Sequence, residues 1–182
     1  MARPLKLDER PARSALLLVG LALASAVAGA APREPSTDRE LFRIERSTNR
    51  NIVRYDAVLT KGGALVRDRP VVAYWVLLAE DGRRDGLTWL ELQLAYGFSV
   101  APARDGFRMT LVAFGERSLT IRKSEGRWRA EVPIASRPAV LRKIWVQAEG
   151  TFLGPHVRWV ELHGVDVRTG EPLVERISKG AS

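Results

Sequence analysis

The chain has 182 residues, a formal net charge of +8, 46% hydrophobic residues and no cysteine. The lack of cysteine excludes disulfide bonds and a cysteine nucleophile, so stability must come from a hydrophobic core, for which this length suffices. The positive charge is compatible with anionic partners such as nucleic acid, lipopolysaccharide or acidic cell-wall polymers. A soluble surface of mixed charge also accounts for it, and we favour that interpretation.

Residues 1–30 have the features of a signal peptide. A net basic start precedes the uncharged run ALLLVGLALASAVAGAA, which is shorter than the roughly 20 residues of a membrane-spanning helix. The run ends with the small-x-small cleavage site Ala28-Gly29-Ala30. We expect cleavage before Ala31 and an exported mature protein, periplasmic or secreted; an uncleaved anchor helix is the alternative. We expect residues 31–40, with two prolines, to be a disordered lead-in and residues 41–182 to form a single domain.

The domain begins with two predicted strands, Leu41–Glu45 and Ile52–Leu59, separated by the polar segment RSTNRN. A hairpin needs only two to five connecting residues, and Ser47–Asn51 meets that requirement. Periodicity therefore favours a simple turn, with a polar binding site as the alternative.

Both interpretations of this segment have a chemical basis. As a turn, Asn49 and Asn51 tolerate left-handed backbone geometry, and Ser47 can hydrogen-bond its own backbone. As a site, Arg46 offers five fixed donors, and the serine, threonine and asparagine side chains offer both donors and acceptors.

Val71–Ala79 is apolar on both faces of a predicted strand, so it needs cover on both sides. The next segment is predicted to be a short helix, Thr88–Tyr96. Thr88 and Glu91 have the spacing of a capping box, and Gly97 is suited to the left-handed conformation that ends many helices. Apolar residues cover most of the circumference, so we expect the helix to be packed into the body of the domain.

Strands dominate the rest of the chain. Phe107–Ala113 alternates in polarity, and LTIRKSEGRWRAEVPI predicts a hairpin with Gly126 in a three-residue turn. Leu141–Phe152 and Val157–Val167 form a predicted pair, and VDVRTGEPLVERI predicts a final hairpin. With about eight strands and one short packed helix, the fold is predicted to be mainly β, a β-rich α+β domain, arranged as an antiparallel barrel or curved sandwich.

The sequence offers little for catalysis or metal binding. It has two histidines and no G-x-S-x-G motif; we expect His156 to be exposed and His163 to be a satisfied surface or core histidine. No histidine pair or carboxylate loop has ligand spacing, and DGRRDG is predicted to be a turn. No glycine-rich phosphate loop follows a strand. We therefore expect no catalytic residues, no metal and no cofactor.

Basic residues are frequent between Arg117 and Lys143, and Trp128 lies among them, a combination found in sheets that bind single-stranded nucleic acid. Trp128 alternates with Arg127 and Arg129, so we expect its ring on the apolar face of a half-buried strand, away from the arginines. Export also makes nucleic acid a less natural partner, and an anion-binding face remains an alternative.

Three stretches resemble the bacterial domain-of-unknown-function family numbered 4833: FRIERSTNRNIVRYDAVL, PVVAYWVLLAEDGRRDGLTWLELQLAYGF and VDVRTGEPLVERI. The resemblance covers nearly all of the mature chain and includes the motifs R-S-x-N-x-N, Y-W and A-Y-G-F. It implies an exported single domain and supplies no activity. It also implies that six residues belong to recurring motifs: Arg46, Ser47, Asn49, Asn51, Trp75 and Tyr96. A structural role for them, tying loop backbone to the helix end, is the alternative to a site.

From these observations we expect a non-enzymatic exported domain that binds a small molecule, a peptide or a cell-envelope component. A barrel of about eight strands can hold one small ligand or be filled by its own side chains. The candidate ligand-binding residues are the six motif residues and Glu91. One alternative is a hydrolase-like envelope enzyme that uses Glu45 and Glu91; another is an electrostatic module for anionic envelope polymers. A cavity containing Glu91, Arg46 and Tyr96 would favour a ligand binder or an enzyme.

Overall fold

The structure is a computed structural model that describes residues 39–115, 117–151 and 154–178. All of them belong to one compact unit, Glu34–Ser182. The predicted signal peptide and nearly all of the predicted lead-in lie outside the described residues. Within these ranges, no helix has both the length and the apolar character needed to cross a membrane.

The described part of the chain is mainly β, as predicted, and its eleven strands belong to one sheet. The strands are β1 (Glu40–Arg46), β2 (Asn49–Ala57), β3 (Val71–Leu77), β4 (Arg83–Gly86), β5 (Phe98–Ala103), β6 (Gly106–Leu111), β7 (Ser118–Ser124), β8 (Arg127–Ile134), β9 (Arg137–Thr151), β10 (Gly154–Asp166) and β11 (Pro172–Ser178). The helical elements are η2 (Leu78–Glu80), α1 (Trp89–Glu91), the π-helical η3 (Leu92–Tyr96) and η4 (Val112–Phe114). Sequence patterns did not predict β4 or β5.

Strand β9 connects the parts of this sheet. One of its edges pairs with β10, which in turn pairs with β11. Residues 137–140 of β9 pair with β8, whereas residues 143–146 pair with β1 in parallel. Between these two sections the register with β10 shifts, so that Arg142 is an extra residue in β9. A bulge of this kind bends a strand. It also reverses which residues direct their backbone N–H and C=O groups toward each neighbouring strand.

The backbone hydrogen bonds show that β8 and β1 share the same edge of β9. Before the bulge, the carbonyl of Pro138 faces β10 and accepts from Val167. After it, the carbonyl of Val146 faces β1 and accepts from Ser47. The sheet therefore divides at Arg142 into two arms, β1-β2-β3-β4 and β8-β7-β6-β5.

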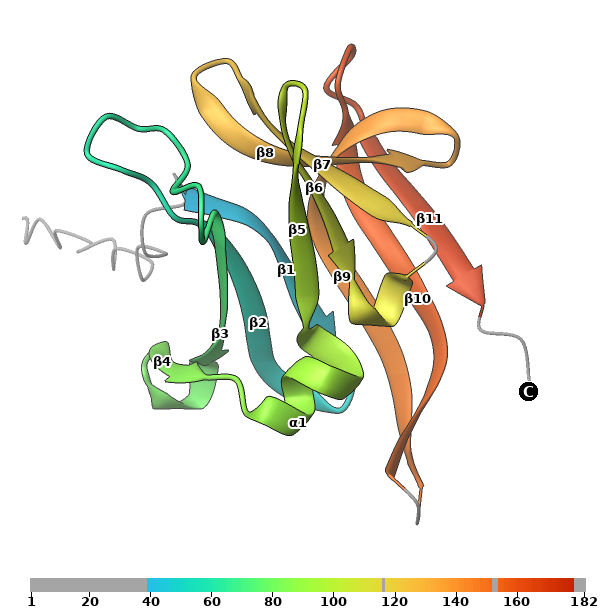
Figure 1. Cartoon of the computed structure of the whole chain (residues 1–182). Helices are drawn as coiled ribbons and strands as arrows, with labels where there is room; N and C mark the ends of the chain where they lie inside the picture. The colour runs from blue at the N-terminus through green and yellow to red at the C-terminus, as the bar shows by residue number, and fades with distance from the viewer. Residues whose placement is uncertain (1–38, 116, 152–153, 179–182) are drawn as a thin grey trace, which may run out of the picture. The chain divides into compact units, whose positions relative to one another are not determined.

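The two arms curl toward each other as a half-barrel and enclose the core between them (Figure 1). Phe42 and Tyr55 of the first arm stack with ring centroids 4.4 Å apart, and Phe98 meets Tyr55 edge to face at 5.8 Å. The Tyr55 hydroxyl donates to the carbonyl of Tyr96 over 2.8 Å. Burial raises the pKa of Tyr55, which keeps the hydroxyl protonated as a donor.

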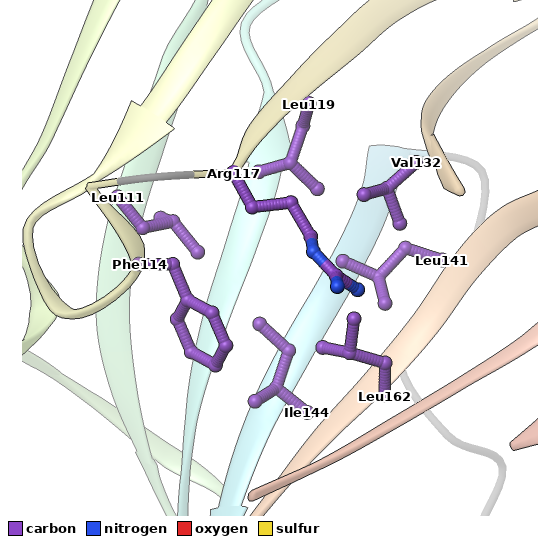
Figure 2. A pocket seen from close by; sticks show the side chains of 8 residues that line it. All are labelled: Leu111, Phe114, Arg117, Leu119, Val132, Leu141, Ile144 and Leu162. Atoms are coloured by element: carbon purple, nitrogen blue, oxygen red, sulfur yellow. The ribbon is translucent and has the colours of Figure 1, made fainter. Parts of the chain in front are cut away.

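The interior is filled by its own side chains. A remaining cavity of about 10 Å³ lies among apolar residues of β6, β7, β8, β9 and β10, with Phe114 and Arg117 at its margin (Figure 2). This volume is close to the minimum for a single water molecule. The guanidinium of Arg117 is engaged by Glu175 through two hydrogen bonds of 2.9 and 3.0 Å. The barrel interior therefore offers no room for a ligand at this position.

Two predicted turns are shorter than expected. Arg46 pairs with Asn49, so the first hairpin turns through Ser47 and Thr48 alone, and the predicted connection Ser47–Asn51 is wrong in length. Polar residues that the pattern assigned to a turn extend the strands instead, because hairpin hydrogen bonds do not require apolar side chains.

The hairpin between β7 and β8 shows a similar difference. It turns through Glu125 and Gly126, both with positive φ (52° and 79°), as a two-residue primed turn requires. Gly126 therefore has the predicted left-handed conformation, in a turn that is one residue shorter than expected.

The predicted helix is present, and its capping box is confirmed: Thr88 Oγ1 accepts from Glu91 N, and the Glu91 carboxylate accepts from Thr88 N. Its apolar residues are less buried than expected. The helix packs through Tyr96, whereas Trp89 is 73% and Leu94 is 70% exposed. The wide π-helical turn removes the 3.6-residue spacing that would have aligned these side chains on one buried face.

The predicted left-handed conformation of Gly97 is wrong, because its φ is −67°. Glycine is required there for a different reason. A Cβ atom at Gly97 would lie 1.9 Å from the carbonyl oxygen of Leu92, so only glycine permits this close approach after the π-helical turn.

These observations predict that two substitutions in the helix differ in their effect on stability. Thr88→Ala removes the capping oxygen and should lower the free energy of unfolding by about 0.5–2 kcal/mol. Trp89→Ala should change it by less than about 0.5 kcal/mol, because the ring is largely exposed. Chemical denaturation of both variants measures the difference. A larger loss for Trp89→Ala would contradict the exposed position of that ring.

Candidate functional site

Four of the seven predicted site residues meet next to α1: Arg46, Trp75, Glu91 and Tyr96. The guanidinium of Arg46 lies 4.8 Å from the ring centroid of Trp75 and 5.4 Å from that of Tyr96. The two rings meet edge to face, with centroids 5.3 Å apart. Trp75 Nε1 donates to Glu91 Oε1 over 3.0 Å. We call these four residues the aromatic clamp.

The carboxylate of Glu91 is fully engaged within the clamp. Besides the bond from Trp75, its Oε2 accepts from the backbone N–H of Thr88 at 2.7 Å and from the Thr88 hydroxyl at 2.8 Å. Burial alone would raise the pKa of Glu91, but these hydrogen bonds and the charge of Arg46 outweigh it and lower the pKa. A carboxylate held in its ionised form by structural donors is poorly suited to act as a general acid.

Glu45 does not join the clamp, because adjacent residues of a strand point to opposite faces of the sheet. Its Oε1 accepts from Arg43 Nε at 2.7 Å, and its Oε2 lies 3.2 Å from Lys143 Nζ. Burial tends to raise the pKa of Glu45, but bonds from Arg43 and Lys143 lower it overall. Glu45 therefore points to the face of β1 opposite the one on which Arg46 meets the clamp. The two carboxylates of the predicted enzyme alternative, Glu45 and Glu91, lie apart, and each has its own partners.

The three remaining site residues tie backbone segments together. Ser47 Oγ donates to the carbonyl of Ala148 at 2.8 Å and accepts from its N–H at 3.0 Å, joining the first hairpin to β9. Asn49 Oδ1 accepts from Asn51 N at 2.8 Å, and Asn51 Oδ1 accepts from the N–H of Leu78 at 3.2 Å. These contacts favour the structural interpretation of the polar segment.

The histidines behave as surface residues. His156 is exposed, and the half-buried His163 has its Nε2 3.1 Å from Glu161 Oε2 on the surface of the sheet. Among the residues that the structure describes, no group of three or more histidines or acids is arranged to hold a metal ion.

A groove with largely apolar walls lies where the half-barrel is open, between β3 and β5. It has a volume of about 380 Å³, and its walls are formed by Val71 and Ala73 from β3 and by Phe98, Val100 and Pro102 from β5. Leu92 of the π-helical turn also lines it, as do Arg67 and Arg69, which are exposed. We call this the open-side groove.

The wall formed by β5 carries backbone groups that point into the groove. The β5–β6 hairpin closes at the pair Ala103–Gly106, and Val112 N donates to the carbonyl of Gly97. Hydrogen bonding alternates along an antiparallel pair, so the odd-numbered residues of β5 bond to β6, and the N–H and C=O groups of Phe98 and Val100 face the groove. Pro102, which has no N–H, also occupies a groove-facing position, as expected for proline in an edge strand.

The wall formed by β3 also carries backbone groups that point into the groove. Val58 N donates to the carbonyl of Pro70, which fixes the alternation along the β2–β3 pair. The backbone groups of Val71 and Ala73 therefore point away from β2, and β4 pairs with β3 only from Tyr74 onward. Two short stretches of strand edge thus face the groove.

The aromatic clamp lies at one end of this groove. Trp75 follows Ala73 of the first wall by two residues, and Tyr96 precedes Phe98 of the second wall by two residues. Arg46, which contacts both rings, therefore links the two walls where they approach α1. Sequence reasoning identified the clamp residues but missed the groove, because the predicted elements did not include β5. The alternation of Phe98, Val100 and Pro102 with small residues was the available signal.

The clamp can be tested through stability. Arg46→Ala removes two cation–π contacts and should lower the free energy of unfolding by about 1–3 kcal/mol. Arg50→Ala is the matched control, because Arg50 lies in the same hairpin and is exposed; it should change stability by less than about 0.5 kcal/mol. Urea denaturation of both variants measures this. Equal losses for the two substitutions would show that Arg46 does not link the walls.

Comparison with known proteins identifies the family. The family described as "Domain of unknown function (DUF4833)" matches residues 42–176. No curated protein and no solved structure matches the chain. The matched region includes the aromatic clamp and both walls of the open-side groove. The chain therefore belongs to the DUF4833 family.

Proposed function

We propose that this domain is a non-enzymatic binding domain that takes an extended peptide segment in the open-side groove. The observation that carries this proposal is the pair of strand edges, β3 and β5, whose backbone groups face a groove of about 380 Å³ with largely apolar walls. An added strand can satisfy such groups, and β-strand addition to an exposed edge is a common form of peptide recognition.

The walls specify the pattern of the peptide. Val71 and Ala73 on β3, and Phe98 and Val100 on β5, belong to or pack against the hydrophobic core. Alternate side chains of an added strand would point toward this apolar surface, and the intervening ones would point to solvent. The expected ligand therefore alternates apolar and polar residues and pairs with β5, with an antiparallel arrangement favoured because it is the more stable.

Charge favours an acidic character at the polar positions. Arg67, Asp68 and Arg69 line the groove and are exposed, which leaves a local excess of one positive charge, and the whole chain has a formal charge of +8. Complementary charge raises the association rate and selects among peptides of similar apolar pattern.

The other candidate functions have less support. A small molecule held inside the half-barrel is not supported, because the cavity there is about 10 Å³, far below the roughly 300 Å³ of a small-molecule pocket. The hydrolase alternative depends on Glu45 and Glu91, whose oxygens are already bonded to structural partners.

We also propose that the domain acts outside the cytoplasm, on the strength of the basic start, apolar run and Ala28-Gly29-Ala30 site of residues 1–30. Protein recovered from the native host should begin at or near Ala31 and fractionate outside the cytoplasm. Intact-mass measurement after cell fractionation checks both points. A full-length chain in the membrane fraction would contradict the proposal.

Peptide binding can be tested through one backbone N–H. Val100→Pro removes a donor that faces the groove while leaving the β5–β6 hydrogen bonds in place. It should weaken binding of a fluorescent peptide that alternates valine and glutamate by about tenfold, the equivalent of about 1.4 kcal/mol, measured by fluorescence polarisation.

Val100→Ala is the matched control, since it shortens the same side chain but keeps the N–H; it should bind the peptide better than Val100→Pro. Ala101→Pro should instead lower the melting temperature, because the N–H of Ala101 bonds to β6. Equal affinity of the Val100→Pro and Val100→Ala variants, with both folded, would refute strand addition at this edge.

A further inference from the structure

A second pocket lies where the two arms of the sheet separate along β9. It has a volume of about 80 Å³ and is bordered by the beginnings of β1 and β8 and by the bulge of β9. Three arginines line it: Arg127 and Arg129 from β8, and Arg142 from β9. We call it the fork pocket.

The bulge explains why Arg142 lies here. It is the residue that the register shift between β9 and β10 leaves without a counterpart, and it lies between the section of β9 that pairs with β8 and the section that pairs with β1. Bulges redirect side chains and are frequent beside functional sites. Arg142 is exposed, so a solute can reach it.

Arginines outnumber carboxylates in the lining of the fork pocket. Glu40 lines it, and its carboxylate lies 3.4 Å from both Arg43 Nη1 and Arg54 Nε. Arg129 pairs with Glu125 at the exposed tip of the hairpin, over 2.5 Å. Both carboxylates thus have an arginine partner, whereas Arg142 has no ion pair among the described residues.

The pKa of Arg142 reflects this arrangement. Burial lowers it first, and repulsion from Arg129 and Arg127 lowers it further, against the opposing effect of Glu40. An anion between the guanidinium groups would relieve the repulsion. Convergence of like charges is a cost that binding sites commonly carry.

Trp128 forms a further part of the lining. It packs against the core, as predicted, and its Nε1 donates to the carbonyl of Gly63 at 3.0 Å, which fixes the orientation of the ring. The expectation that Trp128 lies away from the arginines is wrong in one respect, because at the start of β8 it lines the same pocket as Arg127 and Arg129.

We propose that the fork pocket binds a phosphate group, with Arg142 and Arg129 as its principal ligands. A volume of about 80 Å³ is room for roughly five to eight water molecules, enough for one tetrahedral oxyanion. Guanidinium groups present paired N–H donors that match the oxygens of phosphate, and a phosphate monoester carries about −1.5 to −2 charge near neutral pH. The remainder of a larger ligand would extend into solvent.

Thermal melts of the purified full chain with inorganic phosphate test this proposal. The melting temperature should rise and saturate with phosphate, but not with chloride at the same ionic strength. Arg142→Met keeps the aliphatic stem and removes the donors, so it should abolish the rise; Arg129→Met provides a second variant if the first fails to fold. Arg108→Met, at an exposed position of β6, is the matched control and should keep the response.

Two further probes distinguish the source of the phosphate group. Sedimentation with phosphatidic acid vesicles, against phosphatidylcholine vesicles, tests a lipid headgroup, and glycerol phosphate in the melts tests a soluble monoester. Binding of either that Arg142→Met abolishes supports the proposal and assigns the source. The same response in the parent, Arg142→Met and Arg129→Met, or no saturable response to phosphate, would overturn it.

Discussion

The arrangement of the domain depends on the way β9 divides one edge between two partners. An ordinary strand offers each edge to a single neighbour, but β9 pairs with β8 before Arg142 and with β1 after it. The bulge allows the change because it alters which backbone groups face each side. Both arms therefore start from the same edge of β9 and curl over a shared core. Because both arms start on the same edge, their far strands, β3 and β5, meet across a groove with free edges on both sides.

An open half-barrel needs a contact that holds its free walls at a fixed spacing, and the aromatic clamp provides one. The clamp joins the end of β1 to β3 and to Tyr96 at the end of η3 through rings and a guanidinium group rather than through backbone pairing. The adjacent hydrogen bonds of Ser47 and Asn51 hold the hairpin that carries Arg46. These contacts give the polar segment a structural role beside the clamp.

The sequence was sufficient for local features that depend on neighbouring residues. The capping box at Thr88, the left-handed conformation of Gly126 and the long pair β9–β10 follow from short-range patterns, and these patterns also indicated the mainly β class. The parallel pairing of β1 with β9 joins residues about a hundred positions apart, and no alternation of polarity indicates it. The groove and the fork pocket both depend on that pairing, so neither could be inferred from local patterns. Of the candidate site, the clamp residues were identified, but their contacts with one another were not.

Pro102 has a consequence for the behaviour of the protein in solution. A free strand edge invites pairing with the same edge of another molecule, and such pairing leads to aggregation. At Pro102 the edge of β5 lacks a donor, so an approaching copy would leave a carbonyl without a partner at that position. The arginines Arg67 and Arg69 beside the groove would also face their counterparts in a second basic molecule. The edge to which we propose a peptide adds is thereby discouraged from pairing with a second copy of the chain.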